Sequence, residues 1–265
     1  MKKKVLFASM LLASLLNAIE LKIGASPVPH AQILEVVKDN LKQEGVDLII
    51  VPFTDYVTPN LALNDGAIDA NYFQHLPYME KMVKDRGLKI KEIAKIHIEP
   101  LGIYSKRFKT LEGLRDHARV AIPNDPTNVS RALILLHNEG VIKLKDPKNL
   151  ACTTLDIVEN PKRVRIVEIE APLLPRMLGD VDLAVINGNY ALQAGLSHRS
   201  ALALEDKRSA YANIIATQEN TSTQKAEALQ KLIKAIQSQE VANFITKKYQ
   251  GEIIPVFEVQ TNPAK

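Results

Sequence analysis

Residues 120–136, VAIPNDPTNVSRALILL, contain a strand, a turn and the start of a helix in immediate succession. The apolar run Val120–Ile122 is typical of a buried strand, and the turn-forming residues 124–128 end it. Arg131 follows one turn into an apolar-periodic helix. In an α/β sheet, such a unit places unpaired backbone N–H groups where small acids bind, and an arginine there can grip a carboxylate. The stretch therefore predicts an α/β sheet, with either an acid-binding site or an ordinary strand–helix connection and a solvated arginine.

The sequence on both sides of this stretch alternates between strand-like and helix-like periodicity. We expect strands at 21–25, 46–52, 69–72, 90–98, 102–104, 120–122, 164–169 and 183–186, and helices at 30–43, 59–64, 77–86 and, as one long amphipathic element, 223–249. Alternating β and α elements predict a mostly parallel architecture, here with two sheets. The chain is long enough for one large domain or two lobes.

Aromatic side chains gather around a predicted strand end, in DANYFQHLPY at 69–78. The rings of Tyr72 and Phe73 and the imidazole of His75 would suit an apolar or thioether ligand, because sulfur contacts aromatic rings favourably. In the alternative interpretation, Tyr72 and Phe73 belong to the core and His75 is hydrogen-bonded at a helix start.

Two asparagines flank other apolar strands. Asn187 follows the strand at 183–186, and Asn213 precedes the apolar run 214–216. Their amides could hydrogen-bond the amino and carboxylate groups of a ligand, although asparagine beside a strand is often simply a turn residue.

The first 18 residues have the layout of a secretory signal peptide. Lysines at positions 2–4 precede the apolar run Val5–Leu16, which is too short to span a bilayer, and we expect cleavage after Ala18. No cysteine lies near this point to accept a lipid, so the sequence predicts a freely periplasmic protein. The one cysteine, Cys152, cannot form an intramolecular disulfide and is expected to be a small buried side chain.

Charge and missing motifs argue against several classes of protein. Loss of the three signal lysines would lower the formal net charge from +4 to +1, which leaves no concentrated basic face for nucleic acid. The sequence has no paired-cysteine or HExxH metal spacing, no GxSxG elbow and no Walker-type phosphate loop. We therefore expect a binding protein, with no catalytic residue, no metal, no cofactor and no nucleic-acid partner.

Seven segments, taken together and in this order, carry a resemblance to a known family. They are GASPVPHAQIL (24–34), PFTDYVTPNLAL (52–63), IDANYFQHLPY (68–78), EPLGIYSKR (99–107), AIPNDPTNVSRALILL (121–136), DLAVINGNYA (182–191) and YANIIA (211–216). The chain resembles the NlpA-type substrate-binding proteins, above all the methionine-binding subunits of bacterial methionine ABC importers. This resemblance implies a two-lobed α/β periplasmic binding protein fold, type II-like, with the ligand cleft between lobes joined by crossover strands. It places one lobe at 19–105 with 206–265 and the other at 106–205.

The resemblance also implies which residues bind the ligand. They are Tyr56, Tyr72, Phe73, His75, Asn128, Arg131, Asn187 and Asn213. The first four would line the side-chain pocket, Arg131 would hold the α-carboxylate with Asn128 beside it, and the last two asparagines would meet the polar end. Glu99 could neutralise the ammonium, an idea based on charge alone. His30 is expected to have a structural role at the start of the first helix.

The expected function is capture of L-methionine by lobe closure, followed by delivery to an ABC permease in the inner membrane. Alternatives within the same class are another apolar amino acid or a methionyl dipeptide. A periplasmic enzyme on the same fold is the alternative from another class, and the lack of a nucleophile–base pair argues against it. Family members are commonly lipoproteins, so the missing cysteine beside the signal is a departure from the family pattern.

Overall fold

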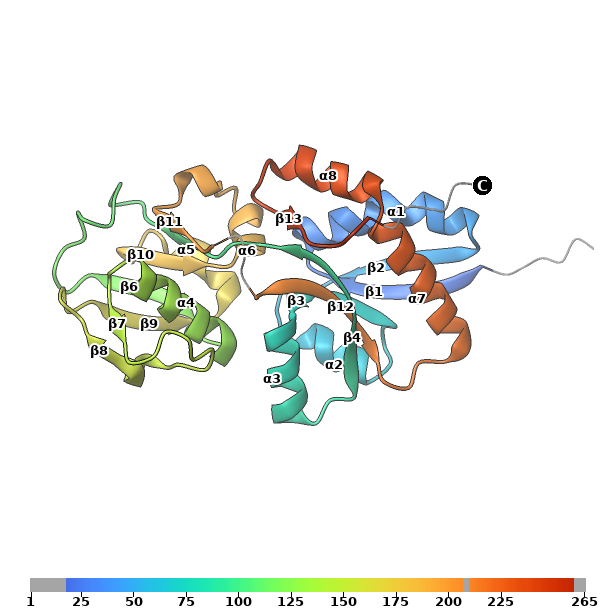
Figure 1. Cartoon of the computed structure of the whole chain (residues 1–265), viewed down its shortest axis with the longest axis horizontal. Helices are drawn as coiled ribbons and strands as arrows, with labels where there is room; N and C mark the ends of the chain where they lie inside the picture. The colour runs from blue at the N-terminus through green and yellow to red at the C-terminus, as the bar shows by residue number, and fades with distance from the viewer. Residues whose placement is uncertain (1–17, 207–209, 260–265) are drawn as a thin grey trace, which may run out of the picture.

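Two β-sheets, one in each of two lobes that lie side by side, organise the chain (Figure 1). The computed structural model describes residues 18–206 and 210–259, so the expected signal peptide lies outside the described residues except for Ala18. Helices pack on both faces of each sheet. The expected two-lobed α/β fold is confirmed.

The first lobe contains a six-stranded sheet in the order β13-β4-β12-β3-β1-β2. Its strands are β1 (Ile19–Ala25), β2 (Val46–Pro52), β3 (Ala70–His75), β4 (Ile90–Ile98), β12 (Ala212–Gln218) and β13 (Ile254–Pro255). β1 pairs in parallel with β2 and β3, whereas β12 runs antiparallel to β3 and β4, and β13 antiparallel to β4. The expected mostly parallel sheet is wrong here, because β4 leads to the second lobe and β12 returns from it, and it is wrong for the second lobe too, where antiparallel pairings are as many as parallel ones.

Helices cover both faces of this sheet. One face carries α1 (Gln32–Gln43), α7 (Thr223–Ile236) and α8 (Gln239–Tyr249), and the other carries α2 (Thr58–Asn64) and α3 (Leu76–Arg86). Gly87 ends α3 in the left-handed conformation that glycine adopts without strain, with φ of 65°. A single helical turn, Pro27–Ala31, precedes α1, which therefore begins later than expected.

The long helix expected at 223–249 is wrong, because the chain breaks between α7 and α8. The side chain of Ser238 accepts a hydrogen bond from the Val241 backbone and starts a new helix there. Amphipathic periodicity continues through the break, since both helices bury an apolar stripe against the same face of the sheet. Within the described residues, no helix combines the length and the hydrophobicity needed to cross a membrane.

The second lobe contains a five-stranded sheet in the order β11-β5-β10-β6-β9. Its strands are β5 (Gly102–Tyr104), β6 (Arg119–Pro123), β9 (Arg165–Ile169), β10 (Leu183–Ile186) and β11 (Ala203–Leu204). One face carries α4 (Pro126–Asn138) and the other α5 (Leu174–Met177) and α6 (Gly188–Gln193). A small ribbon of β7 (Lys143–Leu144) and β8 (Ile157–Glu159) and short turns at 154–156, 171–173 and 198–200 complete the lobe. Cys152 is buried beside α4, its Sγ 3.2 Å from the Ser130 hydroxyl, as expected for a small buried side chain.

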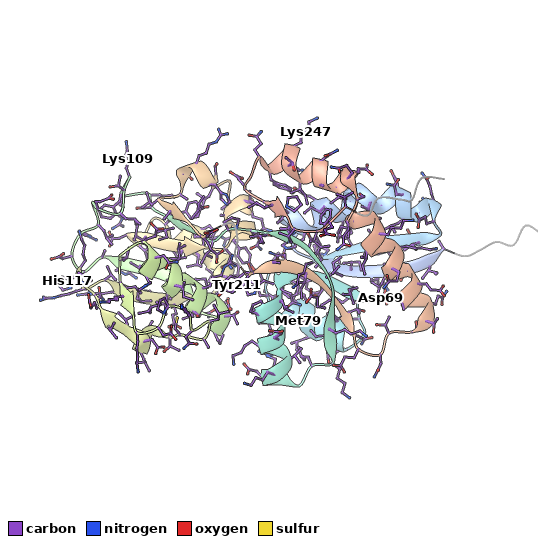
Figure 2. All side chains as sticks on the ribbon, viewed as in Figure 1. Asp69, Met79, Lys109, His117, Tyr211 and Lys247 are labelled. Atoms are coloured by element: carbon purple, nitrogen blue, oxygen red, sulfur yellow. The ribbon has the colours of Figure 1, made fainter. Side chains whose placement is uncertain are left out.

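The lobes are joined by two crossings. Residues 99–101 connect β4 to β5, and residues 205–211, described except for 207–209, connect β11 to β12. Tyr211 lies in the second crossing, between the lobes (Figure 2). The lobe boundary expected at 105/106 falls after β5, but β5 pairs with β10 in the sheet of the second lobe. The boundary expected at 205/206 falls inside the second crossing.

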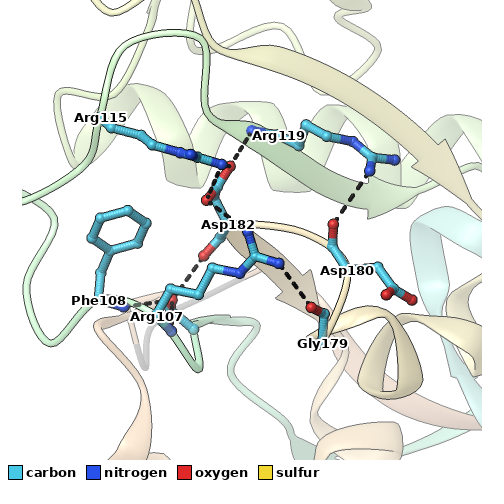
Figure 3. A network of polar contacts seen from close by, with 8 residues as sticks. Arg107, Phe108, Arg115, Arg119, Gly179, Asp180 and Asp182 are labelled. Carbon is cyan, nitrogen blue, oxygen red and sulfur yellow. Dashed lines mark hydrogen bonds and ion pairs between the residues drawn. The ribbon is translucent and has the colours of Figure 1, made fainter.

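A buried carboxylate fixes the start of β10, the strand that leads to Asn187. Asp182 accepts hydrogen bonds from the Arg119 backbone at 2.9 Å, Arg115 Nη2 at 3.1 Å and Arg107 Nη1 at 3.5 Å (Figure 3). Burial alone raises the pKa of Asp182, but the hydrogen bonds and positive charges of these arginines outweigh it and leave the pKa below its ordinary value. The network therefore holds the start of β10 beside β6, at the end of the strand away from Asn187.

Candidate functional site

A pocket lies between the lobes, where β3 and β10 end and α4 and α6 begin. Its lining residues are Tyr56, Phe73, Gln74, His75, Tyr78, Glu99, Asn128, Arg131, Asn187, Gly188, Asn189 and Asn213. The space among these side chains, including the part that is open to solvent, is about 330 Å³. Seven of the eight expected site residues line this pocket, and Tyr72 does not.

Tyr72 lies behind the pocket wall. Tyr72 and Phe73 point to opposite faces of the sheet: Tyr72 packs in the core under α1, whereas Phe73 packs in the cluster on the other face. Its hydroxyl hydrogen-bonds His97 Nδ1, and its ring edge contacts His30 with centroids 4.6 Å apart. The expectation that Tyr72 lines the ligand pocket is therefore wrong, and its contacts make it a support for the two buried histidines.

Aromatic rings form one wall of the pocket. Tyr56 lies at its centre, with ring centroids 6.0 Å from Phe73, 5.9 Å from Tyr78 and 5.0 Å from Tyr190. The Tyr78 hydroxyl donates to the Tyr56 carbonyl at 2.9 Å, and the Tyr56 hydroxyl donates to Asn189 Oδ1 in the other lobe at 2.6 Å. Sequence reasoning missed Tyr78, although its position one turn after His75 on a helix was a usable signal. The wall offers rings and no charged group to a ligand side chain.

A chain of neutral side chains links the lobes. His75 Nδ1 accepts from the Tyr78 backbone, so its Nε2 donates to Asn128 Oδ1 at 3.2 Å. Burial, and then the charge of Arg131, lowers the pKa of His75 to about 3, which keeps the imidazole uncharged. Asn128 Oδ1 also accepts from Asn187 Nδ2 at 3.0 Å. Asn128 therefore supports the pocket by holding His75 and Asn187.

The N-terminus of α4 already has an anion. Asp125 caps the helix by accepting from the Asn128 backbone at 3.0 Å, and its carboxylate also accepts from Asn128 Nδ2. The expectation that these backbone N–H groups bind a ligand acid is wrong, because the chain's own carboxylate occupies the position.

Arg131 projects from α4 toward both crossings. Its Nε donates to Glu205 Oε1 at 2.9 Å and its Nη2 to Glu205 Oε2, so the pair is bidentate. Nη2 also donates to the Glu99 carbonyl at 2.8 Å, and the guanidinium lies 4.5 Å from the centre of the Tyr211 ring. Burial lowers the pKa of Arg131, but Glu205, Tyr211 and Glu99 together raise it more, so the pKa lies above its ordinary value. Sequence reasoning missed Glu205, which is far from Arg131 along the chain.

Nη1 is the part of the guanidinium that remains for a ligand. Within the described residues, the hydrogen bonds of Arg131 come only from Nε and Nη2. A ligand carboxylate at Nη1 would meet the guanidinium beside the Glu205 carboxylate.

Glu99, at the first crossing, contacts two buried histidines. Its Oε1 lies 2.7 Å from His97 Nε2 and 3.3 Å from His30 Nε2. Burial lowers the pKa of His30 to about 4 and that of His97 to about 3, and burial raises the pKa of Glu99. His30 lies beneath the pocket, so the structure supports its expected structural role.

These three side chains are also the one group among the described residues that could hold a metal ion. Their ligand atoms lie within 4.8 Å of one another. The 2.7 Å contact between His97 and Glu99, and the 3.0 Å contact from His30 to Asn213 Oδ1, show that the same atoms already form a hydrogen-bond network. We therefore interpret His30, His97 and Glu99 as a hydrogen-bond network in which the two imidazoles orient the Glu99 carboxylate.

Some polar atoms of the pocket have no partner in the part of the chain that the structure describes. These are Asn187 Oδ1, an acceptor, and Asn189 Nδ2, a donor. Gly188 between them approaches Glu99 so closely that a Cβ would lie 2.7 Å from the Glu99 Cβ. A glycine is therefore required for α6 to pack against this crossing.

Comparison with known proteins gives a consistent result. The profile of a family described as NlpA lipoprotein matches residues 21–257. The D-methionine-binding lipoprotein MetQ of Escherichia coli K12 is 46% identical over 235 residues, which cover 87% of this chain and 86% of that protein. A nutrient-binding protein from Burkholderia cenocepacia, solved bound to methionine, is 46% identical with a TM-score of 0.85, covering 89% of this chain and 100% of that one. A periplasmic substrate-binding protein of an ABC transporter from Coxiella burnetii is 43% identical with a TM-score of 0.83, covering 89% and 100%.

These names correct one expectation about location. The matching family and several relatives are described as lipoproteins, which contradicts a freely periplasmic protein without a lipid anchor. That expectation rested only on the lack of a cysteine near Ala18, and it is withdrawn.

Proposed function

Because the chain belongs to the NlpA lipoprotein family, we propose that it captures L-methionine between its lobes for an ABC importer. The observation that carries this proposal is the composition of the pocket. An uncharged aromatic wall faces a group of charged and amide side chains, which suits an amino acid with an apolar side chain. The similarity to a methionine-bound nutrient-binding protein supports the choice of methionine.

The two ends of the ligand would contact different sides of the pocket. We place the thioether side chain against Tyr56, Phe73 and Tyr78, because ring contacts with sulfur are favourable. The α-carboxylate would bind Arg131 Nη1, and the acceptor Oδ1 of Asn187 would face the amine. Asn213 would contribute its amide nitrogen, since its Oδ1 contacts His30 at 3.0 Å.

Lobe closure would complete the site. The hydrogen bonds from Tyr56 to Asn189 and from His75 to Asn128 both join the first lobe to the second across the pocket. A ligand that bridges the lobes would favour this arrangement over an open one, and exclusion of water would strengthen its polar contacts. The closed protein would then deliver methionine to a membrane permease and perform no catalysis itself.

A thermal-shift panel on ligand-stripped protein tests the proposal. The panel holds the common amino acids, both enantiomers of methionine and methionyl dipeptides. We expect stabilisation by methionine above leucine, and none by lysine or glutamate, because a second charge would be buried without a partner. Greater stabilisation by lysine or glutamate would refute the pocket assignment.

The matched variants for this panel are Phe73→Ala and Phe108→Ala. Phe73 lines the pocket, whereas Phe108 packs against the core of the second lobe, away from it. Only Phe73→Ala should abolish the shift by methionine. A larger shift with D-methionine would move the proposal to that enantiomer, and a larger shift with leucine or a dipeptide would replace the ligand while keeping the binding function.

A further inference from the structure

Three buried amide side chains form a cluster beside the aromatic wall of the pocket. Asn60 lies on α2, Asn71 and Gln74 lie on β3, and each is at most 4% exposed. Asn60 Nδ2 donates to Gln74 Oε1 at 2.7 Å, and Gln74 Nε2 donates to Asn60 Oδ1 at 2.7 Å, so these two amides form a reciprocal pair. Asn71 Nδ2 donates to Asn60 Oδ1 at 2.9 Å, and Asn71 Oδ1 accepts from Gln74 Nε2 at 3.0 Å. Such a cluster holds its backbones in one arrangement, because breaking a bond leaves a buried polar group unpaired.

A β-bulge in β3 makes the amide cluster possible. The pairing of β3 with β12 shifts register between Ile214 and Ile215, where Phe73 is the extra residue on β3. Strict alternation would turn Asn71 and Gln74 to opposite faces of the sheet, but a bulge re-aims the side chains beside it. Gln74 therefore meets Asn71 on the face that α2 covers.

The amide cluster fixes the two segments that carry the aromatic wall. Tyr56 lies in the loop that enters α2, and Phe73 adjoins Gln74 on β3. Asn71 Nδ2 also donates to the Pro59 carbonyl at 3.3 Å, which holds the first turn of α2 against the strand. The ring centroids of Tyr56 and Phe73 lie 6.0 Å apart, and this distance depends on how α2 sits against β3.

A fixed wall and an adaptable wall select ligands differently. A wall whose parts cannot move relative to one another discriminates between ligand shapes, whereas a wall that can repack accepts several. Of the three described side chains in the amide cluster, only Gln74 lines the pocket. Asn60 and Asn71 can therefore act on a ligand only through the residues that they hold.

We propose that Asn60 and Gln74 are positioning residues that set the shape specificity of the pocket, so that it prefers an unbranched apolar side chain to a branched one. Asn71 ties their amide pair to the first turn of α2. This inference rests on the proposed function, since it concerns the side-chain wall of the same pocket. It implies that the preference for methionine over leucine depends on Asn60, a residue outside the pocket.

Calorimetry with L-methionine, L-norleucine and L-leucine measures this preference. All three ligands carry the same α-ammonium and α-carboxylate, so their affinity ratios report on the side-chain wall. In the unaltered protein, leucine should bind roughly 10- to 100-fold more weakly than methionine, which is the range for one small change of shape in an apolar pocket. Norleucine is unbranched and should bind within about 10-fold of methionine. Norleucine binding more weakly than leucine would overturn the inference, because the preference would then depend on sulfur.

Asn60→Leu is the decisive variant, because leucine has a similar volume and position 60 does not line the pocket. The variant leaves the amides of Gln74 and Asn71 short of partners, so the affinity ratio of methionine to leucine should fall below about 3-fold. Gln32→Leu is the matched control, since Gln32 accepts from the Tyr249 hydroxyl at 2.7 Å on the opposite face of the sheet. An unchanged ratio in Asn60→Leu, or an equal fall in Gln32→Leu, would overturn the inference.

An exchanged pair tests the positioning role directly. Asn60→Gln together with Gln74→Asn keeps both amides and the same number of methylene groups between α2 and β3. The double variant should return the ratio to within about 3-fold of the unaltered protein, whereas Gln74→Asn alone should not. A double variant whose ratio is no higher than that of Gln74→Asn would overturn the positioning role.

Asn60→Asp keeps the inference testable if Asn60→Leu does not fold. The change is isosteric and removes the donor to Gln74 Oε1, so it should also lower the affinity ratio of methionine to leucine. An added charge at this position acts equally on both ligands and cancels in the ratio. An unchanged ratio in folded Asn60→Asp would overturn the inference.

Two results separate this inference from the proposed function. If the unaltered protein binds none of the three ligands, the proposed function fails and the inference fails with it. If the unaltered protein prefers methionine to leucine and the variants at Asn60 keep that preference, only the positioning role fails.

Discussion

Replacement of Arg131 by alanine should lower both ligand affinity and stability. Arg131 is 4% exposed, and its removal leaves the Glu205 carboxylate without its bidentate partner. Breaking a buried ion pair by removing one partner costs about 3–5 kcal/mol, against a total unfolding free energy of about 5–15 kcal/mol. The variant should therefore fold with reduced stability, and weaken methionine binding by about 2–5 kcal/mol.

The assays are urea unfolding followed by circular dichroism and calorimetry with methionine. Adding Glu205→Gln to Arg131→Ala should recover at least half of the lost stability, because the unpaired charge is removed. Arg176→Ala is the control, since Arg176 is an exposed arginine of the same lobe. Stability no lower than in Arg176→Ala would refute the ion pair, and unchanged affinity in Arg131→Ala would remove Arg131 from the ligand site.

Three further predictions concern the supports of the site. Asp182→Ala should lower the unfolding free energy by about 2–4 kcal/mol, because it leaves the Arg119 N–H without an acceptor, whereas the exposed Asp180 should tolerate alanine. Folding lowers the pKa of Asp182, so its contribution to the unfolding free energy should be complete above its unfolded pKa of about 3.9 and lost as pH falls through the folded value. If the unfolding free energy of Asp182→Ala depends on pH as much as that of the unaltered protein, this prediction is wrong. Tyr72→Phe should change methionine affinity by less than about 3-fold, because the hydroxyl faces a buried histidine; calorimetry showing a larger loss would return Tyr72 to the pocket. Ser238→Ala should lower the melting temperature through loss of about 1 kcal/mol of helix capping, and no change would argue against the break between α7 and α8.

Local sequence patterns predicted much of the fold. The strands at 90–98, 102–104 and 183–186 are confirmed with the expected bounds, and the helix that ends at Gly87 is confirmed as well. Each depends on periodicity and on turn residues within a few positions along the chain. The break at Ser238 was missed because the same apolar stripe continues on both sides of it.

The candidate site was predictable only in part, because local sequence patterns indicate which residues lie near a pocket but not which face of a sheet each one occupies. Residue type and neighbouring pattern indicated that Arg131, Phe73, His75 and Asn187 belong near a pocket, and all four line it. Which face Tyr72 occupies depended on strand alternation relative to the sheet, so the prediction placed it on the wrong side.

Only the tertiary structure decided how the charges are paired. Glu205 meets Arg131, and Glu99 meets His30 and His97, because the two crossings bring together segments that are distant in sequence. The sequence by itself determined the alternation of elements and the kinds of side chain available to a ligand. Their pairing depends on sheet register and on how the lobes close, and these are set by long-range packing that local spacing does not encode.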